Sequence, residues 1–290
     1  MPQRQVTGIY ESGSNHWVGD GFPVRNLFPS NGISRQVDPF LMLDYAGPAT
    51  FAPSARPRGV DTHPHRGFET VTIAYQGSVD HRDSGGNAGT IGPGDVQWMT
   101  AASGVVHEEK HGLDFTRQGG TFEMVQLWVN LPRQHKMTSP RYQSIASSAI
   151  PKVDLGAGSY ARIIAGDWNG TRGPAQTFTP LSLFDLNLQN GAAVEVPLID
   201  SHNAAAVLLR GSVMLNGSHR LEAEAMMATL GSSGDSLRIE ASAPSLLLIL
   251  AGEPINEPVA SYGPFVMNTQ EEIRQAIEDY RSGRMGALAG

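Results

Sequence analysis

Short β-prone runs, separated by Gly, Asn and Ser, follow one another along most of this 290-residue chain. The pattern is clearest between residues 181 and 252, where runs such as LSLFDLNL, AAVEVPL and SLLLILAG recur at intervals of roughly 8–12 residues. Thirty-three glycines and nineteen prolines supply the tight turns that this spacing needs. The sequence therefore predicts an all-β fold, either a sandwich or a barrel.

The chain divides into two halves with similar patterns. Residues 70–84, TVTIAYQGSVDHRDS, and residues 207–217, VLLRGSVMLNG, each place a Gly-Ser pair between two β-prone runs. This predicts a hairpin in the first half and a weak internal repeat. Residues 133–159, between the halves, are polar and weakly patterned. Because 290 residues suit two domains of ordinary size, we expect domains at 1–150 and 151–290.

The C-terminal stretch NTQEEIRQAIEDYRSGRMG has a different pattern. Thr269 or Asn268 can cap a helix, acidic residues occupy its first turn, and Gly283 can end it. Apolar residues recur at helical spacing: Ile273, Ile277 and Tyr280. We therefore expect the second β-domain to end in one short helix.

Composition excludes several kinds of site and partner. The chain has no cysteine, which rules out disulfides, thiolate zinc sites, iron–sulfur clusters and cysteine nucleophiles, so any metal must be held by nitrogen and oxygen. A formal net charge of −7 argues against binding to nucleic acid or to anionic membranes. No apolar leader precedes the first runs, and no segment reaches the roughly 18 apolar residues of a membrane span. We expect a cytoplasmic protein.

Residues 62–70, THPHRGFET, place two histidines one residue apart. Side chains at i and i+2 of a strand point to the same face, so His63 and His65 should point together and Pro64 away from them. Because proline cannot donate to a β-ladder, Pro64 predicts the start or the edge of a strand, and we expect a strand to begin there at an accessible rim. The two imidazoles can converge on one ion at distances of roughly 2.0–2.2 Å.

A second pair of potential ligands lies in VVHEE. The same alternation places Glu109 on the face of His107 and turns Glu108 away. Three nitrogens and one carboxylate oxygen suit iron, manganese, nickel or zinc better than calcium or magnesium, which prefer oxygen ligands. An octahedral ion held in this way keeps two positions for water, dioxygen or a chelating substrate. A single His-x-His is more often two surface histidines, whereas two pairs on either side of the GPGD turn form a specific pattern.

The other histidines are weaker candidates. His81, in VDHRD, is the best spare ligand, but the charged residues beside it are typical of a solvated hairpin face. The remaining histidines have no suitably spaced partner: His16, His111, His135, His202 and His219.

Several long motifs resemble those of the pirins, which are members of the cupin superfamily. They are DPFLMLDY, HPHRGFETVT, HRDSGGNAGTIGPGDVQWMTAASGVVHEE, QLWVNLP and AGEPINEPVASYGPFVMNT, and they extend from residue 38 to the C-terminal region. The resemblance implies two tandem cupin barrels of the jelly-roll, or double-stranded β-helix, type. It also implies one non-haem iron in the first barrel, so we expect iron(II), while the ligand set also suits manganese, nickel and zinc. The family's ligands correspond to the same four residues: His63, His65, His107 and Glu109.

The sequence also departs from related patterns. In many cupins the glutamate that follows His-x-His is a ligand, but the pirin pattern leaves Glu69 with a supporting or structural role. Tyr45-Ala46-Gly47 replaces the commoner residues after LMLD, and His-Glu-Glu stands where His-Ser-Glu is more usual. These two differences concern the substrate preference. The second half has IDSHNAA in the place of HPHRG and no counterpart of VVHEE, so we expect its barrel to be structural and metal-free.

Three functions are compatible with these observations. The resemblance to pirins implies a metal-dependent dioxygenase that cleaves flavonols such as quercetin, with the phenolic substrate and dioxygen at the open metal positions and Glu109 as the catalytic base. The alternative is a non-enzymatic, metal-binding regulatory protein that acts on a transcription factor or a metabolic enzyme. A third interpretation is a stress-response cupin that detoxifies another phenol or an aldehyde. Fold alone does not choose among these, because cupins carry out many reactions.

Overall fold

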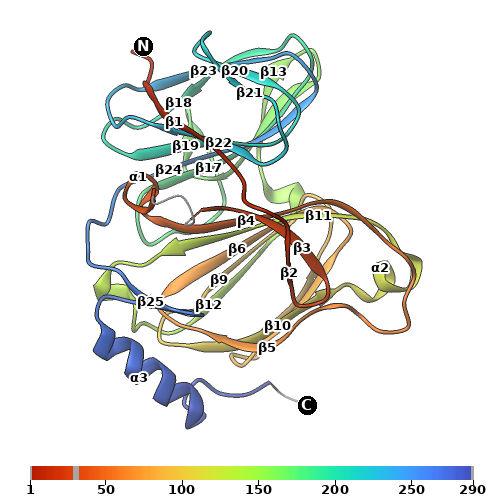
Figure 1. The fold of residues 1–290 in the computed structure, drawn as a ribbon, viewed down its shortest axis with the longest axis vertical. Coiled ribbons are helices and arrows are strands. Elements are labelled where there is room, and N and C mark those ends of the chain that lie inside the picture. Colours follow the sequence, from red (N-terminus) through yellow and green to blue (C-terminus); the bar gives the residue numbers. More distant parts are fainter. Residues whose placement is uncertain (1, 29–32, 289–290) are drawn as a thin grey trace. The chain divides into compact units, whose positions relative to one another are not determined.

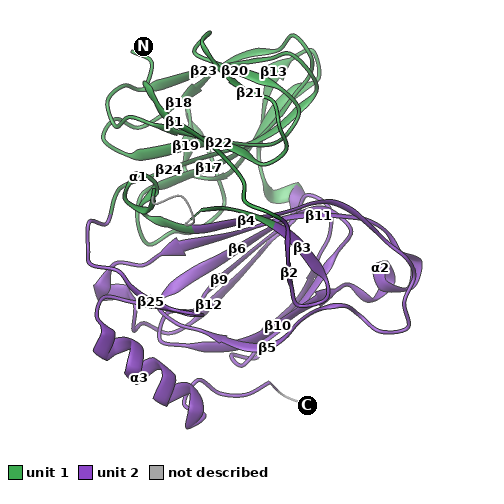
Figure 2. Ribbon diagram, viewed as in Figure 1, with its two compact units in different colours: residues 1–14, 25–41, 148–254 green, residues 15–24, 42–147, 255–290 purple. Residues whose placement is uncertain are grey.

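The computed structural model describes residues 2–28 and 33–288. Most of its regular structure is β-strand, which confirms the predicted all-β architecture (Figure 1). The chain forms two compact units, and each of them is assembled from three segments (Figure 2). Unit 1 contains residues 1–14, 25–41 and 148–254, and unit 2 contains residues 15–24, 42–147 and 255–290. The units are defined by contacts within the fold, and each combines segments from both halves of the chain. They therefore do not test the domain boundary expected at residue 150, which stays a prediction.

A seven-stranded and a four-stranded sheet belong mainly to unit 2. The order of the first is β12 (Arg141–Ile145), β9 (Val96–Thr100), β6 (Phe68–Gln76), β11 (Gly120–Asn130), β4 (Phe40–Phe51), β3 (Phe22–Phe28) and β2 (His16–Val18). Of these strands, β3 ends and β4 begins in residues of unit 1. The order of the second is β5 (Gly59–His65), β10 (Val105–His111), β7 (Val79–Asp83) and β8 (Ala88–Ile91). Apolar residues from both sheets form one buried cluster that includes Phe22, Ala74, Val79, Ile91 and Phe122.

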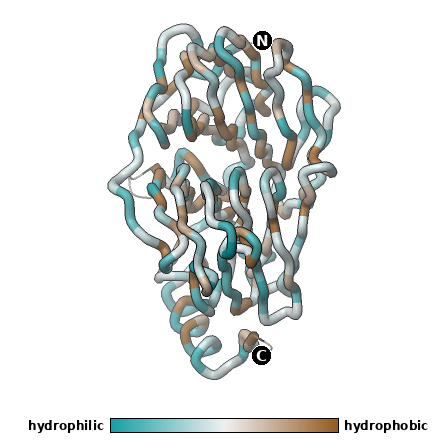
Figure 3. The backbone as a smooth tube through the Cα atoms, turned by 90° about the vertical axis from the view of Figure 1, so that its right-hand side faces the viewer, coloured by the Kyte–Doolittle hydropathy of each residue, from teal (hydrophilic) through white to brown (hydrophobic). Residues whose placement is uncertain are grey.

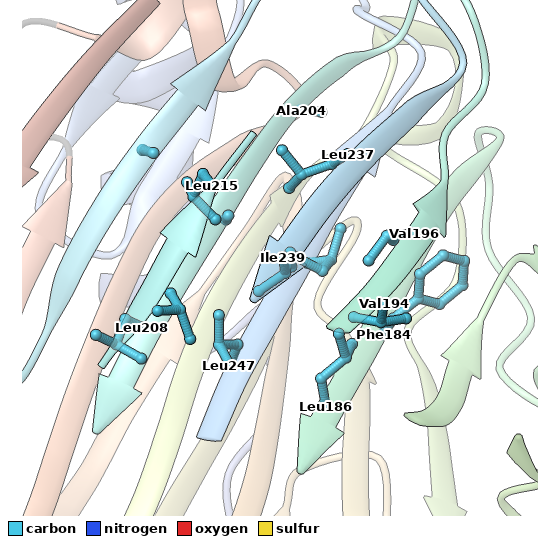
Figure 4. Packing of buried hydrophobic residues seen from close by; sticks show 14 of the residues in the cluster. Phe184, Leu186, Val194, Val196, Ala204, Leu208, Leu215, Leu237, Ile239 and Leu247 are labelled. Carbon is cyan, nitrogen blue, oxygen red and sulfur yellow. The ribbon is translucent and has the colours of Figure 1, made fainter. Parts of the chain in front are cut away.

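Unit 1 repeats this pair of sheets. Its seven strands are ordered β1 (Val6–Glu11), β22 (Met226–Leu230), β19 (Asn203–Arg210), β24 (Ser245–Gly252), β17 (Leu181–Leu188), β14 (Ser159–Ala165) and β13 (Lys152–Gly156). Its four strands are ordered β18 (Ala193–Pro197), β23 (Ser236–Ala241), β20 (Val213–Leu215) and β21 (His219–Leu221). Aliphatic side chains from both sheets fill the interior (Figure 4).

The internal repeat is visible in the strand order. The series β9-β6-β11-β4 in unit 2 matches β22-β19-β24-β17 in unit 1, and β5-β10-β7-β8 matches β18-β23-β20-β21. Apolar and polar residues are interspersed along the backbone (Figure 3). In β18 buried side chains alternate one by one with exposed or half-buried ones, because successive side chains of a strand point to opposite faces of the sheet. The strand that carries His63 and His65 therefore has a defined counterpart, β18, in the other unit.

The predicted hairpin at residues 70–84 is wrong. Both runs are strands, but β6 pairs with β9 and β11, whereas β7 pairs with β8 and β10. The Gly-Ser pair therefore marks a crossing from one sheet to the other, and β19 and β20 of unit 1 repeat the arrangement. Alternation predicts a strand but not its partner, since pairing is decided by contacts that are distant in the sequence.

The C-terminal helix, α3 (Gln270–Arg281), forms as predicted. Thr269 caps it, and a capping box joins Thr269 to Glu272. Ile273 is buried, but Tyr280 is 39% exposed and does not belong to the buried face.

The remaining elements are short: α1 (Ser34–Val37), α2 (Leu113–Gln118), the 3₁₀ turns Arg133–His135 and Ser147–Ala149, and the two-stranded pairs β15 (Asp167–Trp168) with β16 (Thr171–Arg172) and β25 (Ala260–Tyr262) with β26 (Phe265–Met267). Within the described ranges, no helix has the length and apolar character that crossing a bilayer requires.

Candidate metal centre

Strand β5 presents His63 and His65 to the interior of unit 2. It is an edge strand of the four-stranded sheet, as Pro64 predicts, but the His-Pro-His sequence lies at its end and not at its beginning. His65 is 3% exposed, and the ring centroids of His63 and His65 are 4.8 Å apart. The i,i+2 spacing therefore places both imidazoles on one face at the end of a strand.

Strand β10 supplies the second pair of side chains. His107 lies opposite His63 in the ladder, and the register shifts between His107 and Glu109. His107 and Glu109 are buried, whereas Glu108 turns to the other face and pairs with Arg82 at 2.6 Å. The alternation predicted this difference between the two glutamates.

Three imidazoles converge in this region. The ring centroid of His107 lies 4.3 Å from that of His63 and 4.9 Å from that of His65. Potential ligand atoms of these three residues lie within 4.8 Å of one another. His107 and Glu109 form a second such group with His81, so the four residues predicted from the sequence are spread over two overlapping groups that share His107.

The protonation of the histidines suits metal binding. Burial lowers the pKa of His65 and of His107 well below the usual range, and the neighbouring imidazoles act in the same direction. Both rings are therefore neutral near pH 7, which is the form that binds a metal. His63 Nδ1 lies 2.7 Å from the carbonyl oxygen of Asp61, which can only accept, so in the neutral ring Nδ1 carries the proton and Nε2 keeps the lone pair.

Within the histidine cluster, two buried nitrogens lack a hydrogen-bond partner among the described residues. They are Nδ1 of His65 and Nε2 of His107. A buried polar atom without a partner costs roughly 1–3 kcal/mol, so such atoms are rare and need an explanation. The neutral imidazoles and the nearby carboxylate of Glu109 match the nitrogen and oxygen ligands of divalent transition metals. The cluster therefore fits a divalent metal ion.

Glu109 is held by three donors. Its Oε1 accepts hydrogen bonds from Thr72 Oγ1 at 3.2 Å and Gln97 Nε2 at 2.9 Å, and its Oε2 accepts one from Gln126 Nε2 at 2.8 Å. An ionised carboxylate has about four lone-pair sites, so one remains for a further partner. The donors come from β6, β9 and β11, and no sequence pattern pointed to them.

A cavity of about 220 Å³ adjoins the cluster in unit 2. Its polar lining consists of Asp44, His63, His65, Glu109 and Gln126. Its apolar lining includes Phe22, Val24, Met42, Met124 and Trp128. A larger open cleft of about 520 Å³, lined by residues such as Asp20, Arg56, Arg58 and Lys110, contains none of the candidate ligands. The smaller cavity is therefore the candidate binding site, because it combines apolar walls with the histidine cluster.

Comparisons with known proteins show the family of this chain. The Pirin family model matches residues 21–129, and the model of the Pirin C-terminal cupin domain matches residues 183–286. The chain belongs to the pirin family. It is 51% identical to a "Putative quercetin 2,3-dioxygenase" of Pseudomonas aeruginosa over 97% of this chain and 98% of the relative. It is 41% identical to pirin-like protein 2 of Arabidopsis thaliana over 92% of this chain and 81% of that protein.

A solved structure supports the fold. The crystal structure of quercetin 2,3-dioxygenase from Acinetobacter baumannii superposes with a TM-score of 0.96 and 47% sequence identity. The match covers 99% of this chain and 100% of the other. The predicted fold of two tandem cupin barrels is therefore confirmed.

The C-terminal segment of this pirin supports the end of β5. Arg66, next to His65, forms an ion pair with Asp279 of α3 at 2.7 Å and donates to the carbonyl oxygen of Ser103. The buried ammonium of Lys136 donates to the carbonyl oxygens of Gly67 and Val266. Gly67 has a φ of +90°, and a side chain there would meet the Val266 carbonyl, so this position requires glycine. These contacts fix the backbone directly after the two histidines.

The pirin fold also corrects the expectation for His81. The charged sequence around His81 suggested a solvated face, but the residue is 3% exposed and points inward from β7. Its ring stacks on Tyr142, with centroids 4.8 Å apart and an interplanar angle of 12°. Charged neighbours at i±1 lie on the opposite face of a strand, so they say little about the burial of the residue between them.

Glu69 does not belong to either candidate metal group. It is 1% exposed and accepts a hydrogen bond from Thr100 Oγ1 at 2.6 Å. Tyr45, at one of the departures from the commoner pirin pattern, is buried and donates to Glu123 Oε1 at 2.7 Å.

Unit 1 has aliphatic side chains at the corresponding place. The counterpart of β5 is β18, which contributes Val194 and Val196 to the buried cluster, and the counterpart of β10 is β23, which contributes Leu237 and Ile239 (Figure 4). His202 lies beyond the end of β18, so matching IDSHNAA to HPHRG misplaced the counterpart. The strands that hold the candidate ligands in unit 2 thus contribute to an apolar core in unit 1.

Proposed function

We propose that this protein is a metal-dependent dioxygenase that cleaves flavonols such as quercetin. The observation that carries the proposal is the convergence of three imidazoles beside an apolar cavity of about 220 Å³. Two similar proteins, each matching nearly the whole chain, carry the name quercetin 2,3-dioxygenase. The name of the Pseudomonas aeruginosa protein includes the word "Putative". An apolar cavity with a few polar groups at one end suits a planar phenol.

His63, His65, His107 and Glu109 are the residues that we propose hold the metal. The preferred ion is iron(II), and manganese, nickel and zinc suit the same nitrogen and oxygen ligands. When bound, any of these ions supplies a point for substrate chelation, and iron, unlike zinc, also supplies the redox chemistry that dioxygen requires. The partnerless nitrogens of His65 and His107 and the remaining lone pair of Glu109 support this assignment.

Glu109 is also the proposed catalytic base. Its Oε2 accepts a hydrogen bond from Gln126, and both residues line the cavity. We propose that Oε2 takes the hydroxyl proton of the flavonol, with Gln126 turning its amide toward the substrate. Removing this proton increases the electron density of the ring that dioxygen attacks. Asp44 is the other carboxylate in the cavity lining and offers an acceptor for a second phenolic hydroxyl.

The size of the cavity limits the substrate class. Its volume of about 220 Å³ is below the roughly 300–1,000 Å³ of typical ligand pockets. We therefore expect compact planar phenols with adjacent oxygens to bind better than glycosylated flavonols. Trp128 and Phe22 provide flat apolar surfaces for such rings.

Oxygen consumption with quercetin tests the proposal. Protein loaded with iron(II), manganese(II) or nickel(II) is compared with the same protein after treatment with a chelator. We expect uptake only in the loaded protein, and we expect His107→Ala to abolish it because that residue belongs to both candidate groups. His202→Ala, in unit 1, should leave uptake unchanged.

The absence of uptake with every metal would refute the dioxygenase. If metal analysis then still showed one transition ion per chain, the non-enzymatic regulatory protein would be the better account. If His107→Ala retained full metal content, the proposed ligand set itself would be wrong.

A further inference from the structure

A chain of hydrogen bonds runs from Asp83 through His81 to His107. His81 Nε2 lies 3.2 Å from Asp83 Oδ2, and His81 Nδ1 lies 3.4 Å from His107 Nδ1, which is long for a hydrogen bond between nitrogens. Asp83 and His81 lie on β7, the strand that pairs with β10. All three residues are at most 5% exposed.

The donors and acceptors along this chain determine where each proton lies. Burial alone would raise the pKa of the Asp83 carboxyl group, but hydrogen bonds from His81 and Asn87 outweigh burial and lower it. The carboxylate is therefore ionised and accepts hydrogen bonds. His81 Nε2 must then donate, which leaves Nδ1 of a neutral His81 as an acceptor. His107 Nδ1 therefore donates to His81, and His107 Nε2 keeps its lone pair. This is the same atom that lacks a partner among the described residues.

The surroundings of Asp83 and His81 hold this orientation. Asp83 Oδ1 accepts the backbone N–H groups of Gly85 and Asn87 at 2.9 and 3.0 Å, so its Oδ2 is directed to His81. Tyr142 stacks on the ring of His81 and donates through its hydroxyl to Gln97 Oε1 at 3.1 Å. The ring of His81 is thus held between a carboxylate and a fixed aromatic face.

We propose that His81, oriented by Asp83, is a positioning residue that keeps His107 in the Nδ1–H tautomer and so presents the His107 Nε2 lone pair to the metal. This inference rests on the proposed metal site. Neither residue touches the substrate in this account, so both act through His107. Partners of this kind commonly change metal affinity by about 10–100-fold when they are removed, because they fix the tautomer and orientation of the ligand.

The alternative proton arrangement would leave His107 unable to bind a metal. If His81 were an imidazolium, its Nδ1 would donate to His107, and His107 Nε2 would carry a proton and could not bind metal. The groups that face His81 are Asp83, His107 and Tyr142, together with Glu109 in the same candidate group.

Three substitutions test the proposal. Asp83→Asn keeps the shape, but its amide can donate to His81 Nε2 and so reverse both tautomers. His81→Phe keeps an aromatic ring against Tyr142 and removes the acceptor. His81→Asn places a carbonyl oxygen near the original Nδ1 position and should restore the acceptor. Asp80→Asn makes the same chemical change as Asp83→Asn on the outer face of β7 and is the matched control.

Two measurements read the result. Long-range ¹H–¹⁵N NMR of the metal-free protein reports the tautomer of His107, which should be Nδ1–H in the wild type and in Asp80→Asn, and Nε2–H in Asp83→Asn. Calorimetric titration with nickel(II) or zinc(II) should show that the metal affinity of Asp83→Asn and of His81→Phe is lower than that of the wild type by about 10–100-fold. The affinity of His81→Asn should lie within about threefold of the wild-type value, since the acceptor is restored.

Each contrary result has a distinct meaning. An unchanged His107 tautomer in Asp83→Asn, or wild-type affinity in His81→Phe, would overturn the proposal. Loss of binding in His81→Phe and His81→Asn as complete as in His107→Ala would show that His81 is itself a ligand and would also overturn it. If the wild-type protein bound no metal, the proposed function would fail, whereas the NMR measurement would still test the tautomer. Circular dichroism and thermal unfolding confirm that each variant is folded.

Discussion

Glu69→Gln should change how the stability of this protein depends on pH. Glu69 is almost fully buried on β6, where it accepts a hydrogen bond from Thr100 and lies 3.9 Å from the guanidinium of Arg141. Burial raises the pKa of Glu69 from 4.5 to about 7, although the hydrogen bond from Thr100 and the charge of Arg141 act in the opposite direction. The glutamine amide has nearly the same shape, keeps an acceptor for Thr100 and cannot ionise.

The sign of the effect follows from proton binding. The folded protein binds the Glu69 proton more tightly than the unfolded chain does, so stability falls as the pH rises through 4.5 and stops falling above about 7. The difference between these pKa values corresponds to about 3 kcal/mol, at about 1.4 kcal/mol per pKa unit. The free energy of unfolding of Glu69→Gln, relative to the wild type, should therefore increase by about 3 kcal/mol between about pH 4 and pH 8.

Urea denaturation across this pH range measures the effect. Tryptophan fluorescence and circular dichroism follow unfolding, and a chelator in every sample keeps metal binding out of the measured free energy. Glu108→Gln, a glutamate that pairs with Arg82 on the outer face of β10, is the control and should show no comparable trend. A difference between Glu69→Gln and the wild type that stayed constant with pH would refute the reasoning.

Three further predictions concern the site and its supports. Glu109→Ala should lose most of the affinity for nickel(II) in calorimetric titration, whereas Glu108→Ala should change it little; equal losses would mean that the assigned strand faces are wrong. Asp279→Asn should lower the free energy of unfolding by about 1–3 kcal/mol, because buried Arg66 loses its charged hydrogen-bond acceptor; a urea midpoint equal to that of the wild type would contradict this. Leu237→Ala should cost about 2–5 kcal/mol in the core of unit 1 and leave the metal content per chain unchanged, so a loss of metal would show that unit 1 contributes to binding.

Local patterns in the sequence predicted the parts of the site that depend on one strand. His63 and His65, like His107 and Glu109, are two residues apart, and the pleat of a strand places such pairs on one face whatever the strand pairs with. For the same reason the alternation separated Glu109 from Glu108. The capping residues of α3 are equally local, because Thr269 and Glu272 satisfy backbone groups of the first helical turn.

Features that depend on strand pairing could not be predicted in this way. The hairpin expected at residues 70–84 was wrong because β6 and β7 join different sheets. His81 was expected on a solvated face because its neighbours are charged, yet it is buried against His107. The assignment of His63, His65, His107 and Glu109 as metal ligands stays a prediction that metal analysis can test.

The sequence by itself determined the all-β class, the duplicated architecture, the terminal helix and the side-chain pairs that share a face, since each of these follows from periodicity or from contacts within a few residues. Only the tertiary structure decided that β10 lies between β5 and β7, and this places His107 beside His63 on one side and His81 on the other. It also supplied the three donors to Glu109, which come from strands more than ten residues away in the chain. The physical reason is that hydrogen bonds between strands can join any two segments, and the burial of the whole set of apolar faces selects the pairing.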